Sequence, residues 1–554
     1  MFVQEKDPIE VTTSRHIGPR RHCRGNGSCN IVWGSAARPC YDMRVTDKTT
    51  RQNVAAEISG SSPRHPGDSG PEPGIPSTYP APTDTVLCVD LDGTLVRTDL
   101  LWECIVALPK AQPLAFLLAP AWLLRGRARF KEELGRRAKL DVTTLPYRKD
   151  VLSFLQGQHE QGRPVALVTA AENSLAERVA DHLGVFDRVY GSRDGRNLKG
   201  QEKAALLQRE FGERGYEYVG DSRADLPAWK GSRTGYVVGN ERLARRVRTV
   251  TPVERVFENG PASAGAWLRV MRAHHWTKNL LLFLPLLLAH HLGLRPLLAT
   301  ATGFLLFSLC ASGVYIVNDL LDLHSDRAHP WKAKRPFASG ETSIAAGLLI
   351  SSLLTAGSIG LGFLLSPKFG AVLLLYIVMT FWYSLQLKRV LLVDVFVLSS
   401  FYSVRIWAGS LIAAVPLSDW FLVFSLFFFL SLAMAKRYSE LVHAGELAES
   451  GNSGRSYIEG DRALLMHLGI GSSFAAVVIL ALYAHSQEFL LLYRRPEPLL
   501  LTCPVILYWL SRVWLKAHRG ELYEDPLTLS IRDPVTYVVA AIVLTVLIFS
   551  SKAL

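Results

Sequence analysis

Two aspartates follow an apolar stretch early in the chain. Residues 86–95 read VLCVDLDGTL, so Asp90 and Asp92 come just before Gly93. The run is typical of a parallel strand buried on both faces, and α/β proteins carry their sites at the carboxyl ends of such strands. A turn at Gly93 would let both carboxylates approach one point. We expect them to hold Mg²⁺ there, with Asp90 attacking phosphorus and Asp92 handling the leaving-group proton.

Three later segments offer partners for this pair. PVALVTAAENSLAERV predicts a buried strand that ends at Thr169, followed by a helix. NLKGQEKAALLQREF supplies Lys199 and Lys203, either of which could neutralise phosphate charge. YEYVGDSRADLPAWK predicts a third strand that ends at Asp221, with Asp225 four residues later. Their carboxylates would complete the metal site.

Taken in order, these motifs resemble the haloacid dehalogenase (HAD) phosphatase superfamily over about residues 84–250. The resemblance implies a Rossmann-like domain that hydrolyses a phosphate monoester through an aspartyl-phosphate. It also assigns roles: Asp90 as nucleophile, Asp92 as acid and base, Thr169 on the phosphate, Lys203 (or Lys199) stabilising charge, and Asp90, Asp92, Asp221 and Asp225 around Mg²⁺. An inactive domain kept as a scaffold is the alternative.

A second acidic segment lies far along the chain, in YIVNDLLDLHSDRAHPWKAKRPFASG. If it is helical, spacings of three and four put Asp319, Asp322 and Asp326 on one face. Such carboxylates repel one another unless cations neutralise them. Mg²⁺ ions bound to a diphosphate ligand could provide this neutralisation. Asn318 adjoins them, and further phosphate oxygens could be bound by Lys332, Lys334 and Arg335. The alternative is a merely charged loop.

The second half of the chain reads as membrane-embedded. Beyond about residue 267 we count roughly nine apolar runs long enough to span a bilayer. Lys and Arg concentrate in alternate loops, and the formal net charge is +12. We interpret this charge as topology that places the N-terminus in the cytoplasm. Nucleic-acid binding is disfavoured because no recognition motif accompanies the charge.

The pattern NDxxDxxxDxxHPxKxxRP is similar to the first Asp-rich motif of the UbiA-type intramembrane prenyltransferase superfamily, and the resemblance covers about residues 266–554. It implies Mg²⁺-dependent ionisation of a diphosphate substrate, with Asp319 and Asp322 as catalytic residues. Ordinary members carry a second Asp-rich motif, where this chain reads AMAKRYSELVHAGE. With RAHHWTKNLLLFLPLL and EDPLTLSIRDP, the chain looks instead like the decaprenyl-phosphate phosphoribosyltransferase branch.

That branch takes its diphosphate from 5-phosphoribosyl-1-diphosphate (PRPP) and uses polyprenyl phosphate as acceptor. Beside the acidic segment, the candidate substrate-binding residues are Lys278, Lys388, Arg405, Lys436 and Arg437, with Asn279, Tyr383 and Asp394 as weaker candidates. The phosphatase would then remove the 5-phosphate of the lipid product. A conventional prenyltransferase with an aromatic acceptor and a transporter of phosphorylated lipid are the alternatives.

The expected fold is multi-domain: an α/β Rossmann-like domain, then an all-α polytopic bundle in the cell membrane. We expect a disordered tail at 1–82, the phosphatase at 83–250, a linker at 251–265 and the transferase at 266–554; a homo-oligomer is left open.

The expected cap, 99–150, contains LAFLLAPAWLLRGRARFKEELGRR. Its apolar and basic parts fit a membrane-interface segment and an ordinary buried cap helix equally well.

Overall fold

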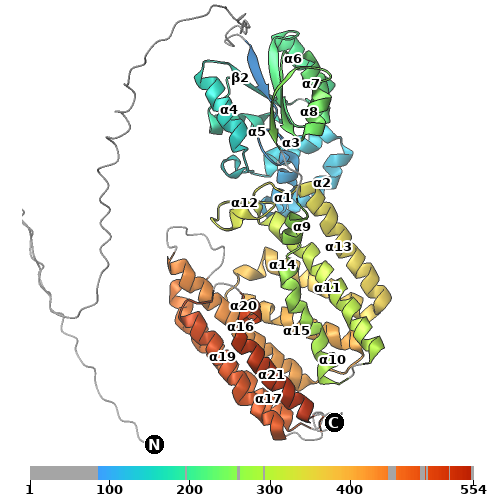
Figure 1. Cartoon of the computed structure of the whole chain (residues 1–554), viewed down its shortest axis with the longest axis vertical. Coiled ribbons are helices and arrows are strands. Elements are labelled where there is room, and N and C mark those ends of the chain that lie inside the picture. Colours follow the sequence, from blue (N-terminus) through green and yellow to red (C-terminus); the bar gives the residue numbers. More distant parts are fainter. Residues whose placement is uncertain are drawn as a thin grey trace, which may run out of the picture. The chain divides into compact units, whose positions relative to one another are not determined.

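The computed structural model describes residues 85–193, 196–258, 263–290, 293–446, 457–486, 493, 497–522 and 525–550. The expected tail at 1–82 lies outside this range. An α/β domain comes first along the chain and a helical domain follows (Figure 1). This architecture is the one that the sequence predicts, while the exact domain boundaries stay predictions.

A six-stranded, entirely parallel sheet forms the centre of the α/β domain. In the order β3-β2-β1-β4-β5-β6, its strands are Arg188–Ser192, Val165–Glu172, Val86–Val89, Tyr216–Gly220, Gly235–Gly239 and Val253–Glu258. Val89 of β1 pairs with Leu167 of β2 and with Val219 of β4. The carboxyl ends of these three strands therefore meet at one edge of the sheet.

Two apolar clusters pack the sheet, one on Leu87 and Val89 and the other on Cys88 and Trp229. Alternate residues of β1 therefore contribute to different clusters, and this explains its unbroken apolar sequence. Helices of the domain outside the cap are α4 Lys149–Glu160, α5 Asn173–Leu183, α6 Gln201–Phe211, α7 Leu226–Gly231 and α8 Glu241–Val247. The 3₁₀ helices are η1 Val142–Thr144 and η2 Arg223–Asp225.

Three helices lie between β1 and α4, where a cap was expected. They are α1 Leu100–Ala111, α2 Pro113–Leu124 and α3 Arg127–Arg137. Asp99 caps α1 by accepting a hydrogen bond from the Leu101 N–H (2.8 Å). Val106 of α1 shares a buried cluster with Ile316 and Phe337 of the helical domain. The cap is thus packed directly against the second domain.

The helical domain contains seven helices that are long and apolar enough to cross a membrane, counted among the described residues. They are built on α11 Leu294–Leu321, α13 Ile344–Leu365, α14 Pro367–Leu385, α15 Val393–Ala413, α16 Asp419–Glu446, α17 Arg462–Ala484 and α19 Thr502–His518. The sequence predicts roughly nine. Of the remaining apolar runs, one forms η3 Ala273–Phe283 with α10 Leu284–Leu288, and the last forms α21 Pro534–Ser550, which is shorter.

Short elements connect these helices and carry most of the polar residues of the domain. They are α9 Ala264–Val270, α12 Leu323–Arg327, η4 Lys332–Lys334, η5 Leu387–Arg389, η6 Glu459–Asp461, η7 Glu497–Leu501 and α20 Pro526–Arg532. Helix α11 ends at Leu321, and Asp322 stands between it and α12. The acidic segment is therefore two helices with a break, and its three aspartates do not share one uninterrupted helical face.

Candidate active sites

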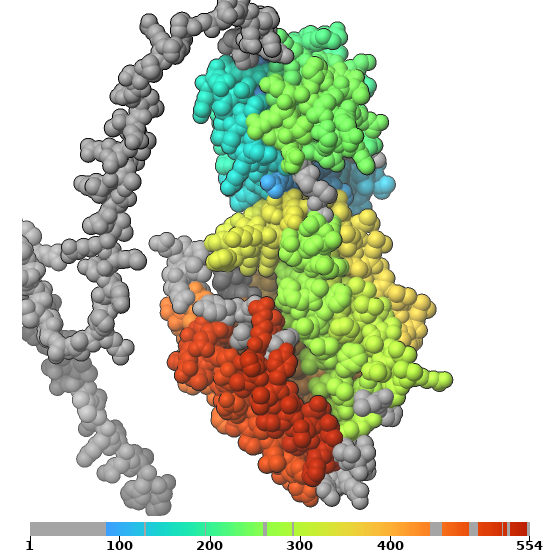
Figure 2. Space-filling view, viewed as in Figure 1, coloured from blue at the N-terminus to red at the C-terminus, as the bar shows by residue number. Residues whose placement is uncertain are grey.

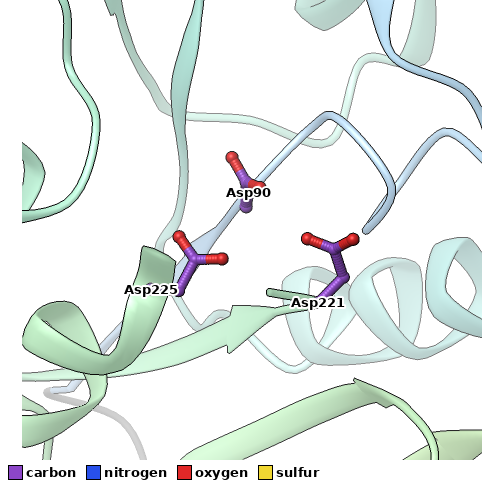
Figure 3. A group of neighbouring side chains, drawn as sticks. All are labelled: Asp90, Asp221 and Asp225. Atoms are coloured by element: carbon purple, nitrogen blue, oxygen red, sulfur yellow. The ribbon is translucent and has the colours of Figure 1, made fainter. Parts of the chain in front are cut away.

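Three carboxylates meet at the carboxyl edge of the sheet. Asp90 follows β1, Asp221 follows β4 and Asp225 ends η2, and one oxygen atom of each lies within 4.8 Å of the others (Figure 3). This is the only such group of potential metal ligands among the described residues. A set of carboxylate oxygens fits a hard cation such as Mg²⁺.

Gly93 allows the loop after β1 to approach Asp221. Its φ angle is +76°, in the region that favours glycine, and a Cβ atom here would lie 2.1 Å from Oδ2 of Asp221. Any larger residue would therefore displace the carboxylate. The turn expected at this glycine is present, and it has a steric reason.

Lys203 is the lysine that lies beside the clustered carboxylates, whereas Lys199 is exposed at the surface. Its Nζ atom lies 2.8 Å from Oδ1 of Asp90 and 3.0 Å from Oδ1 of Asp225, and the Tyr218 hydroxyl is 2.9 Å away. Burial alone would lower the pKa of Lys203, but the two aspartates outweigh burial and raise it. The lysine is thus held as a cation beside Asp90.

One lysine does not neutralise the whole group. Burial raises the pKa of Asp90 to about 6, with Lys203 opposing and Asp225 reinforcing the rise. Burial, and then Asp90 and Asp225, raise the pKa of Asp221 to about 8. When these carboxyl groups are ionised together they repel one another, and a bound divalent cation would balance their negative charge.

Asp92 and Thr169 line the same edge. Oδ1 of Asp92 accepts a hydrogen bond from the Leu100 N–H at the start of α1 (2.8 Å), and burial, followed by Asp99 and Asp90, raises the pKa of Asp92 well above its usual value. Thr169 is fully buried, and its hydroxyl accepts from the Ala171 N–H (3.0 Å). Strand β2 runs on to Glu172, so Thr169 sits at a register irregularity rather than at the strand end.

Lys131 is a residue of this site that sequence reasoning missed. It comes from α3 of the cap, and its Nζ atom donates to the carbonyl of Ala170 (3.0 Å) and to Oδ1 of Asn197 (3.1 Å). Burial lowers the pKa of Lys131, and the nearby carboxylate of Asp92 opposes this shift in part. The basic run around Lys131 gave no sign of this position, because only the fold brings α3 back to β2.

In the helical domain, each aspartate of the acidic segment is paired with a cation. Asp319, in the last turn of α11, pairs with Arg272 and with Arg335, whose Nη1 atom is 3.3 Å away. The same Arg335 nitrogen lies 2.5 Å from Oδ2 of Asp326. Asp322 contacts Lys388 (3.5 Å) and Lys110 of the cap (2.5 Å). The three aspartates do not gather into a metal-type cluster among the described residues.

A cavity of about 780 Å³ adjoins this segment. Its described lining is mostly basic and aromatic: Arg272, His274, His275, Lys278, Tyr315, Asn318, Tyr376, Thr380, Tyr383, Ser384, Leu398, Phe401, Tyr402, Arg405, Lys436, Asp525, Thr528 and Arg532. Oδ1 of Asn318 is buried and accepts no hydrogen bond from the described residues. A cavity with this excess of cations suits a ligand with several anionic groups.

Asp525 is the carboxylate of this lining, and the sequence did not single it out. Its Oδ2 atom lies 2.9 Å from Nζ of Lys278 and 3.3 Å from Nζ of Lys436, and the Tyr402 hydroxyl donates to it (3.2 Å). Burial alone would raise the pKa of Asp525, but Lys436 and Lys278 lower it well below its usual range. Asp525 therefore holds together two lysines that were predicted to bind substrate.

The other predicted residues divide between buried networks and the surface. Asn279 donates to Ser308 (2.9 Å) and accepts from Arg405 (2.7 Å), so it supports an arginine of the cavity. Arg437 binds Asp394 (2.5 Å) and donates to the Tyr383 hydroxyl (2.9 Å). Lys332 and Lys334 are exposed on η4 and are not among the described residues that line the cavity.

Comparisons with known proteins match both halves of the chain. The profile described as "UbiA prenyltransferase family" matches residues 279–522, and "haloacid dehalogenase-like hydrolase" matches residues 87–230. An uncharacterized protein of Sinorhizobium fredii, y4nM, is 36% identical over 474 residues, which cover 82% of this chain and 89% of that protein.

Two further relatives match smaller parts of the chain. The nodulation protein NoeC of Azorhizobium caulinodans is 34% identical over 268 residues, which are 47% of this chain and 85% of that protein. The decaprenyl-phosphate phosphoribosyltransferase of Mycobacterium tuberculosis is 34% identical over 194 residues, which are 34% of this chain and 64% of that enzyme.

Proposed function

Because the chain belongs to the UbiA prenyltransferase family and carries a HAD-like hydrolase domain, we propose that it makes a ribosylated lipid in two steps. The helical domain transfers 5-phosphoribose from PRPP to a polyprenyl phosphate and releases diphosphate. The α/β domain then removes the 5-phosphate. The similarity to a decaprenyl-phosphate phosphoribosyltransferase supports this choice of substrates.

The observation that carries the transferase step is the basic cavity beside Asp319. PRPP brings a diphosphate and a 5-phosphate, and the acceptor brings one more phosphate. Arg272, Lys278, Arg405, Lys436 and Arg532 all line the cavity, more cations than one diphosphate needs. The position of the usual second Asp-rich motif is taken by Lys436, a phosphate-binding rather than a metal-binding side chain.

In the transfer, an oxygen of the lipid phosphate attacks C1 of the ribose while the bond from C1 to the diphosphate oxygen breaks. The attacking oxygen is already anionic, so no general base is required. Asp319, Asp322 and Asp326 would hold Mg²⁺, which neutralises the charge of the leaving diphosphate. Arg272, Arg335, Lys388 and Lys110, now paired with these carboxylates, would turn to phosphate oxygens.

In the hydrolysis, a carboxylate oxygen of Asp90 attacks phosphorus, and the bond to the ribose 5-oxygen breaks. Asp92 supplies the proton for that oxygen. It then takes a proton from a water molecule that attacks phosphorus, and the bond between phosphorus and Asp90 breaks to release inorganic phosphate. Lys203 remains beside Asp90 as a fixed positive charge. Asp90, Asp221 and Asp225 would hold Mg²⁺, which would balance the phosphoryl charge, whereas Asp92, which the sequence also assigned to the metal, lies outside this group of ligands among the described residues. Covalent attachment gives the phosphatase a high effective concentration of the transferase product.

The chain is an integral membrane protein, and we propose that its phosphatase lies on the cytoplasmic side. The short loops after alternate apolar runs are rich in Lys and Arg, and such loops stay in the cytoplasm. PRPP is a polyanion of the cytoplasm that could reach a cavity opening on that side. The bilayer supplies the polyprenyl phosphate.

A single assay tests both steps. Purified full-length protein in detergent is given Mg²⁺, ribose-labelled PRPP and polyprenyl phosphate, and lipid-linked label is separated by chromatography. We expect labelled lipid from the wild type, none from Asp319→Asn, and lipid that keeps its 5-phosphate from Asp90→Asn. Consumption of prenyl diphosphate with an aromatic acceptor instead would overturn the transferase proposal. Equal dephosphorylation by Asp90→Asn would leave the α/β domain as a scaffold.

A further inference from the structure

Helix α2 of the cap exposes almost all of its large apolar side chains. Its sequence is PLAFLLAPAWLL, without a single charge. The exposed fractions are 79% for Leu114, 42% for Phe116, 72% for Leu117, 53% for Leu118, 52% for Leu123 and 89% for Leu124. Part of this blue cap segment is visible at the molecular surface in Figure 2. Such a concentration of exposed apolar side chains on one helix indicates an interaction surface.

The face that α2 turns inward is small. Ala115 and Trp122 are its buried residues, and Arg137 of α3 lies over the Trp122 ring at 5.1 Å. Helix α2 is thus attached to the cap by a narrow contact, while its leucines face outward. An ordinary cap helix would have the reverse arrangement, with leucines inside.

The neighbouring helix α1 determines where α2 lies relative to the ends of the membrane-spanning helices. Only Gln112 separates α2 from α1, and Lys110 near the end of α1 contacts Asp322, the residue directly after the membrane-spanning helix α11. The buried ion pair between Glu103 and Arg327 (2.6 Å) fixes α1 there. Helix α2 therefore begins beside the end of a membrane span, which is the level of the lipid headgroups.

Length and flanking charges agree with that position. A helix of 12 residues is too short to cross a bilayer but suits one that lies in its interface. Pro113 starts the helix, Pro120 lies within it, and exposed Arg125, Arg129 and Arg136 follow. Arginines beside an apolar helix attract the phosphates of lipid headgroups.

We propose that α2 is an interfacial anchor that inserts its leucines into the adjacent leaflet and holds the phosphatase site against the lipid surface. The next helix, α3, carries Lys131 to the rim of that site. A phosphate monoester on a lipid could then reach Asp90 while its polyprenyl tail stays in the bilayer. This last consequence rests on the proposed function, whereas the insertion itself does not.

Insertion is tested by fluorescence in lipid nanodiscs that each hold one copy of the full-length protein. An environment-sensitive fluorescent amino acid replaces Leu117, or, as the matched control, Glu213, which is exposed just before β4. We expect lipids brominated on their acyl chains to quench the probe at 117 and aqueous iodide to quench the probe at 213. Quenching of both probes by iodide alone would overturn the proposal. So would protection at 117 that requires a second copy of the chain.

The functional consequence is tested with Leu117→Asp combined with Leu118→Asp. We expect hydrolysis of the phosphoribosyl lipid in vesicles to lose about tenfold in kcat/KM, because the charges oppose insertion. Hydrolysis of soluble p-nitrophenyl phosphate should be unchanged, which shows that the site is folded. An equal loss on both substrates would contradict the anchor. If the wild type ignores the phosphoribosyl lipid, the proposed function fails while the quenching result stands.

Discussion

The Nζ atom of Lys110 lies 2.5 Å from Oδ1 of Asp322. A lysine of the phosphatase cap thus neutralises a carboxylate of the acidic segment in the transferase domain. Seven residues earlier on the same helix, Glu103 is buried against Arg327. Helix α1 therefore contacts both sites: its first residue, Leu100, donates to Asp92, and Lys110 near its end contacts Asp322.

Lys110→Ala should weaken the donor site of the transferase. Once Mg²⁺ binds the acidic segment, Lys110 becomes available for the diphosphate, and loss of one charged hydrogen bond should raise the KM for PRPP about tenfold. Steady-state assays with varied PRPP measure this, and p-nitrophenyl phosphate hydrolysis should stay unchanged. Lys230→Ala removes an exposed lysine of α7 as the control. Equal KM values for the two variants would exclude Lys110 from the donor site.

Arg327→Gln should destabilise the protein through the partner that it leaves behind. Glu103 is fully buried and Arg327 is 4% exposed, so the single change leaves the Glu103 carboxylate buried without its cationic partner. We expect this to lower the free energy of unfolding by about 3–5 kcal/mol. Thermal unfolding in detergent should show a lower midpoint, partly restored by adding Glu103→Gln. Glu241→Gln breaks the exposed pair with Arg248 and should have little effect. A double variant no more stable than the single one would argue against a direct pairing.

Gly93→Ala should abolish the phosphatase and spare the transferase. The new methyl group would force Asp221 away from the metal group, and a displacement on the order of 1 Å costs about 100-fold in rate. Hydrolysis of p-nitrophenyl phosphate and lipid labelling from PRPP measure the two activities separately. Gly157→Ala, in α4 with nothing within 4 Å of the added atom, is the matched control. Normal hydrolysis by Gly93→Ala would refute the steric argument.

Mg²⁺ should stabilise the protein as well as activate it. A ligand present at 100 times its Kd adds about 2.7 kcal/mol to the free energy of unfolding. We expect titration with Mg²⁺ to raise the unfolding midpoint, chelation to reverse the rise, and Asp221→Asn to reduce it. Asp150→Asn changes an exposed carboxylate of α4 and should behave as wild type. An equal Mg²⁺ response in Asp221→Asn would place the stabilising ion elsewhere.

The grouping of Asp90 with Asp221 could be predicted because both directly follow parallel strands, whereas Thr169 lies within β2 and not at its end. Asp90 and Asp221 each follow a run of apolar residues, and parallel strands bring such ends together. The choice between Lys199 and Lys203 could not be made from spacing, since both precede or begin the same helix. The structure gives the physical reason for the difference: Lys203 points inward from α6 and is 3% exposed.

The transferase cavity was harder to predict because distant segments build it. Asp525 lies 247 residues from Lys278 along the chain, and no periodicity connects them. The acidic segment was recognised, but its break at Asp322 and its pairing with cations depend on neighbours outside the motif. Likewise, composition left α2 equally suited to a core or a membrane surface, and its exposed leucines, which favour the membrane surface, are visible only in the structure.

The buried cluster between α1 and the helical domain is a second attachment between the two domains, in addition to the chain connection. A catalytic domain tied to its neighbour by the chain alone would swing about that single connection and sample many orientations. Here we expect the packing of α1 against the helical domain to restrict that rotation. The distance between the two active sites would then depend on the packed helix α1 and not on the length of the chain connection. Lengthening the connection between β6 and α9 should leave the coupling of the two steps almost unchanged.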